Sequence, residues 1–273
     1  MLALVVAMGS FPLGATLAKS IFPEVGAAGA TVLRLSLAAL MLCLGMRAWR
    51  ARLSPLAWRQ VARYGAVLGL MNLCFYLSLT RLPLGIAVAL EFTGPLSVAL
   101  WHARRALDFV WVALAVAGLS LLLPLRASAA ALDPLGAAFA LAAAMFWALY
   151  IIWGREAVLA AGRWTVALGS LVGALVVLPF GAAAALPALR APTVLAVGLV
   201  VALLSSAVPY SLEMWALTRL PARVFGVSMS LEPALAALAG WVFLAEQLAP
   251  PQYLAIAAII VACGGATLTA RAA

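Results

Sequence analysis

The sequence contains little charge and almost no histidine. Of its 273 residues only 9% are charged and one is a histidine, whereas 67% are hydrophobic. Because a water-soluble surface needs roughly 25–35% charged residues, a soluble domain is excluded. The sequence has no HExxH motif, no glycine-rich phosphate loop and no buried base beside a nucleophile, which leaves metal hydrolysis, ATP-driven pumping and serine hydrolysis unsupported. We therefore predict no enzyme, no cofactor and no metal site.

Cysteine patterns are also absent. Cys43, Cys74 and Cys263 lie in separate apolar runs without CxxC spacing, so we interpret them as packing residues rather than as disulfide partners or metal ligands. No basic segment precedes the first apolar run, so we expect a retained helix there rather than a cleaved signal peptide.

Long apolar runs are what the sequence has in abundance. Stretches of about 20 apolar residues recur along the whole chain, which is typical of transmembrane helices rather than of a membrane barrel. With glycine, proline and charge clusters as breaks, we predict an all-α polytopic membrane protein with ten transmembrane helices. The ten ranges are about 2–20, 27–46, 60–79, 84–101, 109–126, 134–153, 164–181, 192–214, 221–244 and 251–270.

The distribution of basic residues predicts the orientation. If the N-terminus is cytoplasmic, twelve lysines and arginines fall on the cytoplasmic side and four on the other side, namely Lys19, Arg81, Arg126 and Arg190. The positive-inside rule then places both termini in the cytoplasm. The net charge of +9 is explained by these loop residues, so we expect the lipid bilayer, and not nucleic acid, as the partner of the basic side chains.

A short internal repeat predicts the architecture. The sequence LTRLP at 79–83 recurs at 217–221, and the same shift of 138 residues carries Pro95 onto Pro233. We therefore expect two five-helix repeats, residues 1–131 and 132–273. An odd number of spans inverts the second copy, and the site of such proteins lies where the halves meet near the membrane midplane. A chance match in a leucine- and alanine-rich sequence is the alternative.

Two carboxylates lie inside the apolar runs. At a rise of ~1.5 Å per residue, Glu91 lies roughly 10 Å and Glu232 about 16 Å beyond the start of its helix, within a hydrocarbon core ~30 Å thick. A lipid-facing charge there costs at least ~2.5–3.5 kcal/mol, so both should face the protein interior. We interpret both as candidates for binding substrate or proton; a neutral, hydrogen-bonded structural role is the alternative.

Prolines near these residues should leave backbone carbonyls without a helical partner. Pro95 frees the carbonyl of Glu91, Pro233 that of Met229 and Pro209 that of Ser205. Free carbonyls at membrane depth are tolerated where they face protein or a wet cavity. A simple packing kink is the alternative, and it is the interpretation we favour for Pro209.

Helical spacing gathers further polar and aromatic side chains onto common faces. Packing is the alternative for each of them, but buried tyrosine and tryptophan need hydrogen-bond partners. Among the cations, Lys19 lies near a span end and can act as an anchor, whereas Arg34 lies deeper and should be paired with a carboxylate or carbonyls. The further candidates for substrate or proton binding are Asn72, Tyr76, Trp147, Tyr150, Ser206, Tyr210, Glu213 and Lys19.

Several segments carry a family resemblance. The chain resembles the drug/metabolite transporter superfamily with paired EamA repeats, and within it the RhtA-type inner-membrane exporters of threonine and homoserine. The resemblance implies two inverted five-helix halves, a central cavity, and export of small amino acids by proton exchange. Arg104 in the first repeat stands where the second has Glu246, so we expect unequal halves. The segments are GATLAKS at 14–20, PLGIAVALEFTGP at 83–95, DFVW at 108–111, PYSLEM at 209–214 and EPALAA at 232–237.

From these observations we expect a secondary exporter of small neutral amino acids such as threonine and homoserine in the bacterial inner membrane, as a monomer or homodimer. Glu91 would bind the substrate ammonium, and Lys19 or a freed helix end the carboxylate; whether Lys19 or Arg34 contacts substrate stays open. One alternative is an exporter of aromatic amino acids or other amphipathic metabolites or drugs. Another is a non-transporting membrane scaffold or sensor.

Overall fold

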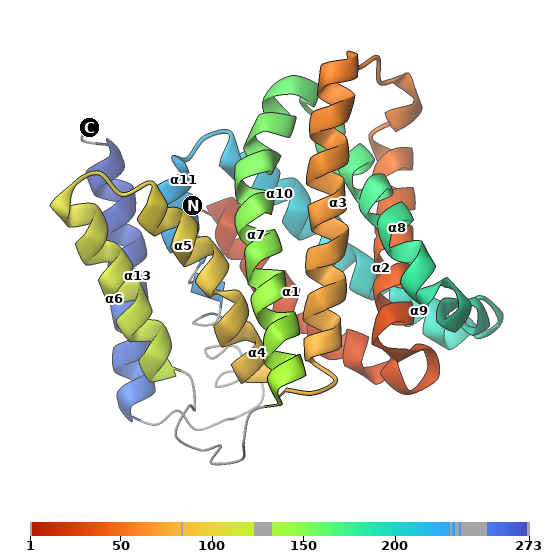
Figure 1. The fold of residues 1–273 in the computed structure, drawn as a ribbon, viewed down its shortest axis with the longest axis horizontal. Helices are drawn as coiled ribbons and strands as arrows, with labels where there is room; N and C mark the ends of the chain where they lie inside the picture. Colours follow the sequence, from red (N-terminus) through yellow and green to blue (C-terminus); the bar gives the residue numbers. More distant parts are fainter. Residues whose placement is uncertain are drawn as a thin grey trace.

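The structure, a computed structural model, describes residues 2–82, 84–122, 133–229, 231–232, 235 and 250–271. These residues form helices and connections without any strand (Figure 1). Two short 3-10 turns, η1 (Ala48–Arg50) and η2 (Leu186–Arg190), and one π-helical turn, η3 (Leu203–Ala207), join longer helices. The α-helices are α1 (Leu2–Ser20), α2 (Phe22–Gly45), α3 (Pro55–Ser78), α4 (Leu84–Glu91), α5 (Thr93–Trp101), α6 (Ala106–Leu122), α7 (Pro134–Ala161), α8 (Trp164–Ala185), α9 (Pro192–Ala202), α10 (Val208–Leu217), α11 (Ala222–Met229) and α13 (Pro250–Arg271).

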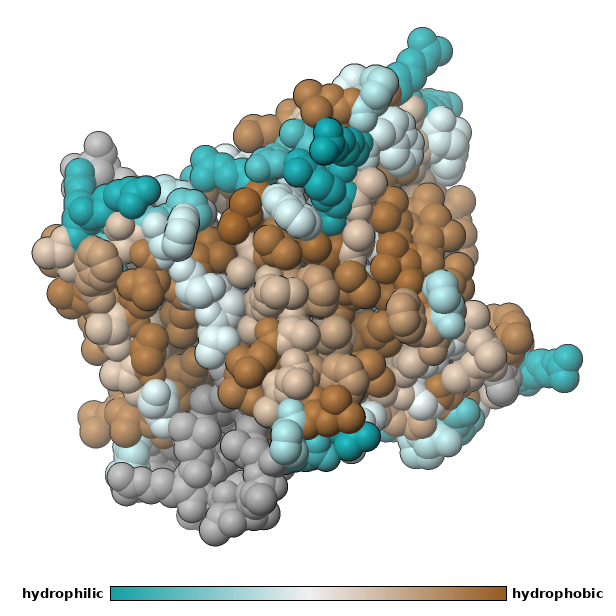
Figure 2. Space-filling view, viewed as in Figure 1, coloured by the Kyte–Doolittle hydropathy of each residue, from teal (hydrophilic) through white to brown (hydrophobic). Residues whose placement is uncertain are grey.

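The surface has the pattern of a protein embedded in lipid. Among the described helices, α2, α3, α7, α8 and the continuous run Pro192–Leu217 are long and apolar enough to cross a membrane. Figure 2 shows a broad apolar band around the middle of the visible face, with hydrophilic side chains gathered at its two ends. An apolar surface of this size marks contact with a membrane. The prediction of an all-helical membrane protein is confirmed.

Several predicted spans differ locally from the observed helices. The span predicted at 60–79 begins earlier, at Pro55, and the span predicted at 134–153 continues to Ala161. The span predicted at 27–46 begins earlier, at Phe22, and is interrupted at Gly26, whose φ of 64° glycine adopts readily. The span predicted at 84–101 is divided into α4 and α5 around Phe92. The span predicted at 192–214 contains the π-helical turn η3. Much of the span predicted at 221–244 lies outside the described residues.

The arginine-rich connections share one end of the molecule. The α2–α3, α5–α6 and α7–α8 connections lie at the top of Figure 1, where α13 also ends. The connection that follows α3 lies at the bottom, beside the start of α7. These three connections, which the positive-inside rule assigns to the cytoplasm, are therefore grouped at a single end.

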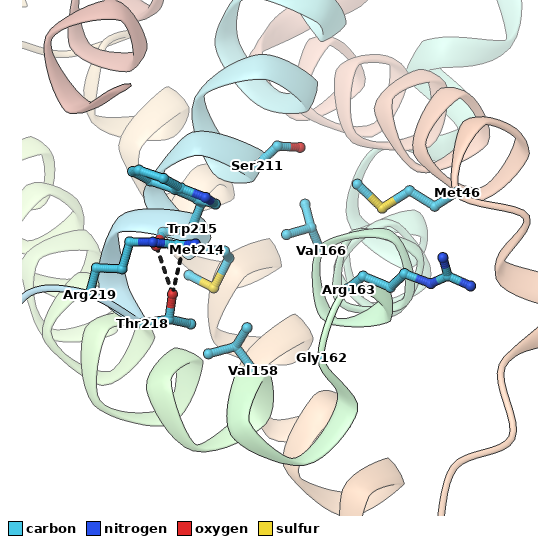
Figure 3. A pocket seen from close by; sticks show the side chains of 10 residues that line it. All are labelled: Met46, Val158, Gly162, Arg163, Val166, Ser211, Met214, Trp215, Thr218 and Arg219. Carbon is cyan, nitrogen blue, oxygen red and sulfur yellow. Dashed lines mark hydrogen bonds between the residues drawn. The ribbon is translucent and has the colours of Figure 1, made fainter. Parts of the chain in front are cut away.

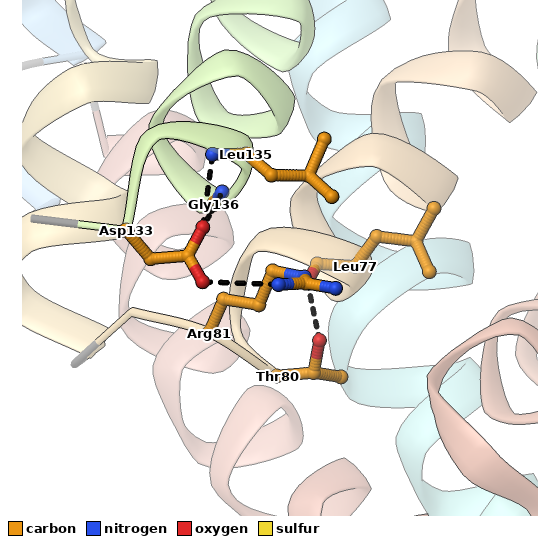
Figure 4. A network of polar contacts seen from close by, with 6 residues as sticks. All are labelled: Leu77, Thr80, Arg81, Asp133, Leu135 and Gly136. Carbon is orange, nitrogen blue, oxygen red and sulfur yellow. Dashed lines mark hydrogen bonds and ion pairs between the residues drawn. The ribbon is translucent and has the colours of Figure 1, made fainter.

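The start of α7 shows how local sequence sets a helix boundary. Asp133 is the N-cap and accepts hydrogen bonds from the backbone N–H groups of Leu135 and Gly136, each at 2.9 Å, and Pro134 occupies the first turn. The other carboxylate oxygen of Asp133 lies 3.0 Å from Nη1 of Arg81 (Figure 4). The N–H of Gly136 first, and Arg81 second, hold the pKa of Asp133 below its usual value. This carboxylate therefore connects the end of α3 to the start of α7.

Replacing Asp133 by alanine should lower the thermal midpoint in detergent at neutral pH, and asparagine, which still caps the helix, should lower it less. The lowered pKa means that the stabilisation is present above the unfolded pKa of about 4 and is lost as pH falls through the folded value. The difference between wild type and Asp133→Ala should therefore shrink in acid. An equal difference at both pH values would contradict this assignment.

Small residues bring the central helices close together. α3 packs against α7 and α8, and α2 packs against α8. A Cβ added to Gly69 of α3 would lie 2.6 Å from the carbonyl oxygen of Gly173 in α8. Such close approach through glycine is typical of helix contacts in membranes. The core of the protein is thus a set of closely packed helices around α3, α7 and α8.

Candidate functional site

A small cavity lies among the central helices. Its volume is about 20 Å³, which is room for roughly one water molecule. Sites that hold drug-sized small molecules measure about 300–1,000 Å³, so this cavity must widen before it can admit a metabolite. Its lining comes from α1, α3, α4, α7, α10 and the stretch after α11. The residues are Phe11, Met71, Asn72, Phe75, Glu91, Trp147, Tyr210, Glu213 and Glu232.

Three carboxylates meet at this cavity. Glu91, Glu213 and Glu232 are 6%, 8% and 8% exposed, so the prediction that Glu91 and Glu232 face the interior is confirmed. All three side chains line the same cavity. The phenol of Tyr150 donates a hydrogen bond to Oε2 of Glu213 at 2.9 Å. Because buried charges are costly unless paired, this arrangement favours protons or a cationic group in the cavity.

Arg34 is the buried cation nearest to this site. It is 1% exposed; Nη2 donates to Oδ1 of Asn72, and Nη1 donates to the carbonyl of Ser205 at 3.3 Å. The prediction that Arg34 pairs with a carboxylate or carbonyls is confirmed by the Ser205 bond. That carbonyl is the one expected to be freed by Pro209. Since it holds a buried cation, the break at Pro209 is more than a packing kink.

A chain of polar and aromatic contacts joins Arg34 to the carboxylates. Oδ1 of Asn72 also accepts from the phenol of Tyr210 at 2.9 Å, while Nδ2 of Asn72 donates to the carbonyl of Leu68 at 2.7 Å. The ring of Tyr210 lies 6.1 Å from that of Tyr150, whose hydroxyl reaches Glu213. These contacts run continuously from Arg34 to Glu213.

Most of the residues predicted for the site are close together. Glu91, Glu232, Asn72, Trp147, Tyr210 and Glu213 line the cavity. Of the others, Tyr150 binds Glu213, the ring of Tyr76 lies 4.6 Å from the guanidinium carbon of Arg34, and Ser206 follows the Ser205 that Arg34 contacts. Their roles in binding remain predictions.

Lys19 and several other predicted features lie elsewhere. Lys19 is partly exposed in the last turn of α1 and is not among the residues that line the cavity. The features that fall outside the described residues are Pro83, Arg126, Pro233, Glu246 and the repeat boundary at 131/132.

Sequence reasoning missed three lining residues and undervalued a further residue. Phe11, Met71 and Phe75 line the cavity. Phe11 and Met71 lie in apolar runs where nothing distinguishes them, whereas Phe75 shares a helical face with Asn72. Arg34 was considered without being chosen for the site, although a cation at membrane depth is a signal of function.

A second, larger cavity opens at the arginine-rich end (Figure 3). Its volume is about 360 Å³. Figure 3 shows Arg219 lying along Trp215 and bonded to Thr218 on one side, with Arg163 on the other. α7 and α10 contribute to both cavities: Met214 lines the larger one and its neighbour Glu213 the smaller. The other lining residues are Met46, Val158, Gly162, Val166 and Ser211.

Comparison with known proteins gives close relatives. The chain is 54% identical over 268 residues to "Threonine/homoserine exporter RhtA" of Escherichia coli (strain K12), covering 98% of this chain and 91% of that protein. It is 53% identical over 270 residues to the protein of the same name from Salmonella typhimurium (strain LT2), with coverage of 99% and 92%.

The family model and a solved structure agree with these relatives. Residues 134–268 match the EamA-like transporter family. A solved structure described as "Crystal structure of protein" superimposes with a TM-score of 0.72 at 20% identity, covering 99% of this chain and 96% of that one; at this identity the likeness concerns the fold. The named relatives are exporters, not enzymes. With more than half of its residues identical to theirs over nearly the whole chain, the protein belongs to the EamA-like transporter family.

Proposed function

We propose that this protein exports small neutral amino acids such as threonine and homoserine across the bacterial inner membrane, in exchange for protons. The observation that carries the proposal is the cavity where Glu91, Glu213 and Glu232 meet, in a chain 54% identical to threonine/homoserine exporters. An amino acid presents an ammonium group, which such a cluster can bind. Protons can occupy the same carboxylates when the substrate has left.

An inverted repeat of two five-helix halves, residues 1–131 and 132–273, is part of this proposal. Asn72 and Tyr210 are hydrogen-bonded and are separated by the same 138 residues as the two LTRLP segments. Equivalent positions meet in this way near a pseudo-two-fold axis. Contacts between α2 and α8 and between α6 and α13 also join helices that would be equivalent in a ten-helix arrangement. The contact between α5 and α11 joins the spans predicted at 84–101 and 221–244, which would be equivalent as whole spans.

Alternating access of the two halves follows from this architecture. The larger cavity would be the cytoplasmic entrance, because it lies at the arginine-rich end that the positive-inside rule assigns to the cytoplasm together with both termini. The ion pair between Arg81 and Asp133 lies at the opposite end. Opening there, with protonation of Glu91 competing against ammonium binding, would release substrate outside and bring protons in.

Filling the larger cavity should block transport. Ser211→Trp should reduce threonine counterflow in proteoliposomes by about tenfold or more, because an indole occupies much of a 360 Å³ space. Ser120→Trp is the matched control, since both hydroxyls bond to the carbonyl four residues earlier and Ser120 is exposed. Equal transport by the two variants would show that the cavity is not an entrance.

Counterflow with purified protein tests the proposed function directly. Proteoliposomes loaded with unlabelled threonine should accumulate labelled threonine, and the chain should protect cells against toxic threonine or homoserine. Stronger competition by phenylalanine or tryptophan than by homoserine would favour the alternative of an exporter of aromatic solutes. No protection and no counterflow would favour a non-transporting scaffold or sensor.

A further inference from the structure

We propose that Arg34, with Tyr76 and Ser206, forms the subsite that binds the α-carboxylate of the substrate. This inference rests on the proposed function, because it concerns the other half of an amino acid whose ammonium group the carboxylate cluster attracts. It also chooses Arg34 over Lys19 as the cation that contacts substrate, a question that the sequence left open.

Unpartnered hydrogen-bond donors carry the argument. Nε of Arg34, the hydroxyl of Tyr76 and the hydroxyl of Ser206 have no hydrogen-bond partner within the described part of the chain. Arg34 is 1% exposed, and Tyr76 and Ser206 are 0% exposed. Buried polar groups in native proteins are nearly always satisfied, so donors left in this state point to an acceptor that arrives later.

The Tyr76 ring and the backbone beside Ser206 contact the guanidinium of Arg34. The ring of Tyr76 lies 4.6 Å from the guanidinium carbon of Arg34. The carbonyl of Ser205, the residue before Ser206, accepts from Nη1 of Arg34. A planar guanidinium matches the two oxygens of a carboxylate, and charge-assisted bonds of this kind are stronger than neutral ones.

Asn72 occupies the position that the substrate would take. Its Oδ1 accepts from both Arg34 and Tyr210, so one neutral oxygen serves two donors. Asn72 also lines the small cavity and bonds to Arg34, which is not among the lining residues. A substrate carboxylate is a better acceptor for a cation than a neutral amide, and it can replace Asn72 once the cavity widens.

The carboxylate subsite lies next to the ammonium site. Both charged groups of such a substrate are attached to one carbon, so their binding groups must be close neighbours. Asn72, which bonds to Arg34, lines the cavity together with Glu91. Lys19, by contrast, is partly exposed at the end of α1, and so the structure favours Arg34.

Ligand pairs that differ only in the carboxylate test this subsite. Affinities of purified protein would be measured for threonine and for its decarboxylated analogue 1-amino-2-propanol. Wild type should bind threonine at least tenfold more tightly. Arg34→Gln and Arg34→Lys should each weaken threonine binding about tenfold or more and leave binding of the amine unchanged. Glutamine removes the charge, and lysine keeps the charge but lacks the planar guanidinium that can bind both carboxylate oxygens. Arg190→Gln, which removes an exposed cation, should leave both affinities unchanged.

Two results would overturn the subsite. One is that wild type binds every amino acid it accepts no more tightly than the corresponding amine, a result that needs no variant and holds even if Arg34 variants fail to fold. The other is an equal loss of affinity for threonine and for its amine in a folded Arg34→Lys variant. If wild type instead prefers another amino acid over that amino acid's amine, the subsite stands and only the threonine assignment fails. If no amino acid binds, the subsite and the proposed function fail together.

Discussion

Replacing Glu91 by glutamine is expected to abolish proton-coupled threonine export while the protein still folds. Glutamine has the same shape and can still form hydrogen bonds, but it neither takes up a proton nor offers a negative charge to an ammonium group. A hydrogen bond to a charged group contributes about 1.5–3 kcal/mol, so threonine affinity should fall at least about tenfold. Export from proteoliposomes under an imposed pH gradient measures the coupling.

The matched control for this result is Glu156→Gln. Glu156 is an exposed carboxylate on α7, 3.0 Å from Arg63, and surface ion pairs contribute about 0–1 kcal/mol. Export by this variant should stay within about twofold of wild type. Full coupled export by Glu91→Gln would remove Glu91 from the mechanism.

A leucine at Gly181 is expected to disrupt the packing of α2 on α8. A Cβ at Gly181 would lie 2.3 Å from the carbonyl oxygen of Ala28 and 2.9 Å from the backbone nitrogen of Gly29. Backbone atoms cannot swing aside as the end of a side chain can, so the two helices must separate. Overpacking costs about 1–3 kcal/mol and occasionally more; we expect the upper end of this range or beyond, and a clear drop in the thermal midpoint in detergent.

Gly264→Leu provides the control for the packing prediction. Gly264 lies in α13, where an added Cβ would meet nothing within 4 Å. The thermal midpoint of this variant should therefore equal that of wild type. The two substitutions add the same side chain within long apolar helices, and they differ in what that side chain meets. Equal melting of the two variants would show that the contact at Gly181 does not limit stability.

The sequence by itself determined the class of the protein and much of its site. Apolar runs of spanning length predict helices because lipid offers the backbone no hydrogen-bond partners. A charge at membrane depth is expensive unless it faces the interior, which is why Glu91 and Glu232 could be predicted to be buried. Helical spacing also placed Asn72, Tyr210 and Glu213 on faces that line the cavity.

Only the tertiary structure decided which polar groups meet. Arg34 reaches Asn72 and Ser205 across 38 and 171 residues of sequence, and such pairing depends on how each helix is rotated and packed. Hydropathy predicts the length of a helix but not the rotation of the helix about its own axis. The same reason explains why Lys19 was predicted for the site although it lies outside the lining, and why Phe11 was overlooked. A sequence can therefore mark a charge as buried, while its partner is set by the packing of helices far apart in the chain.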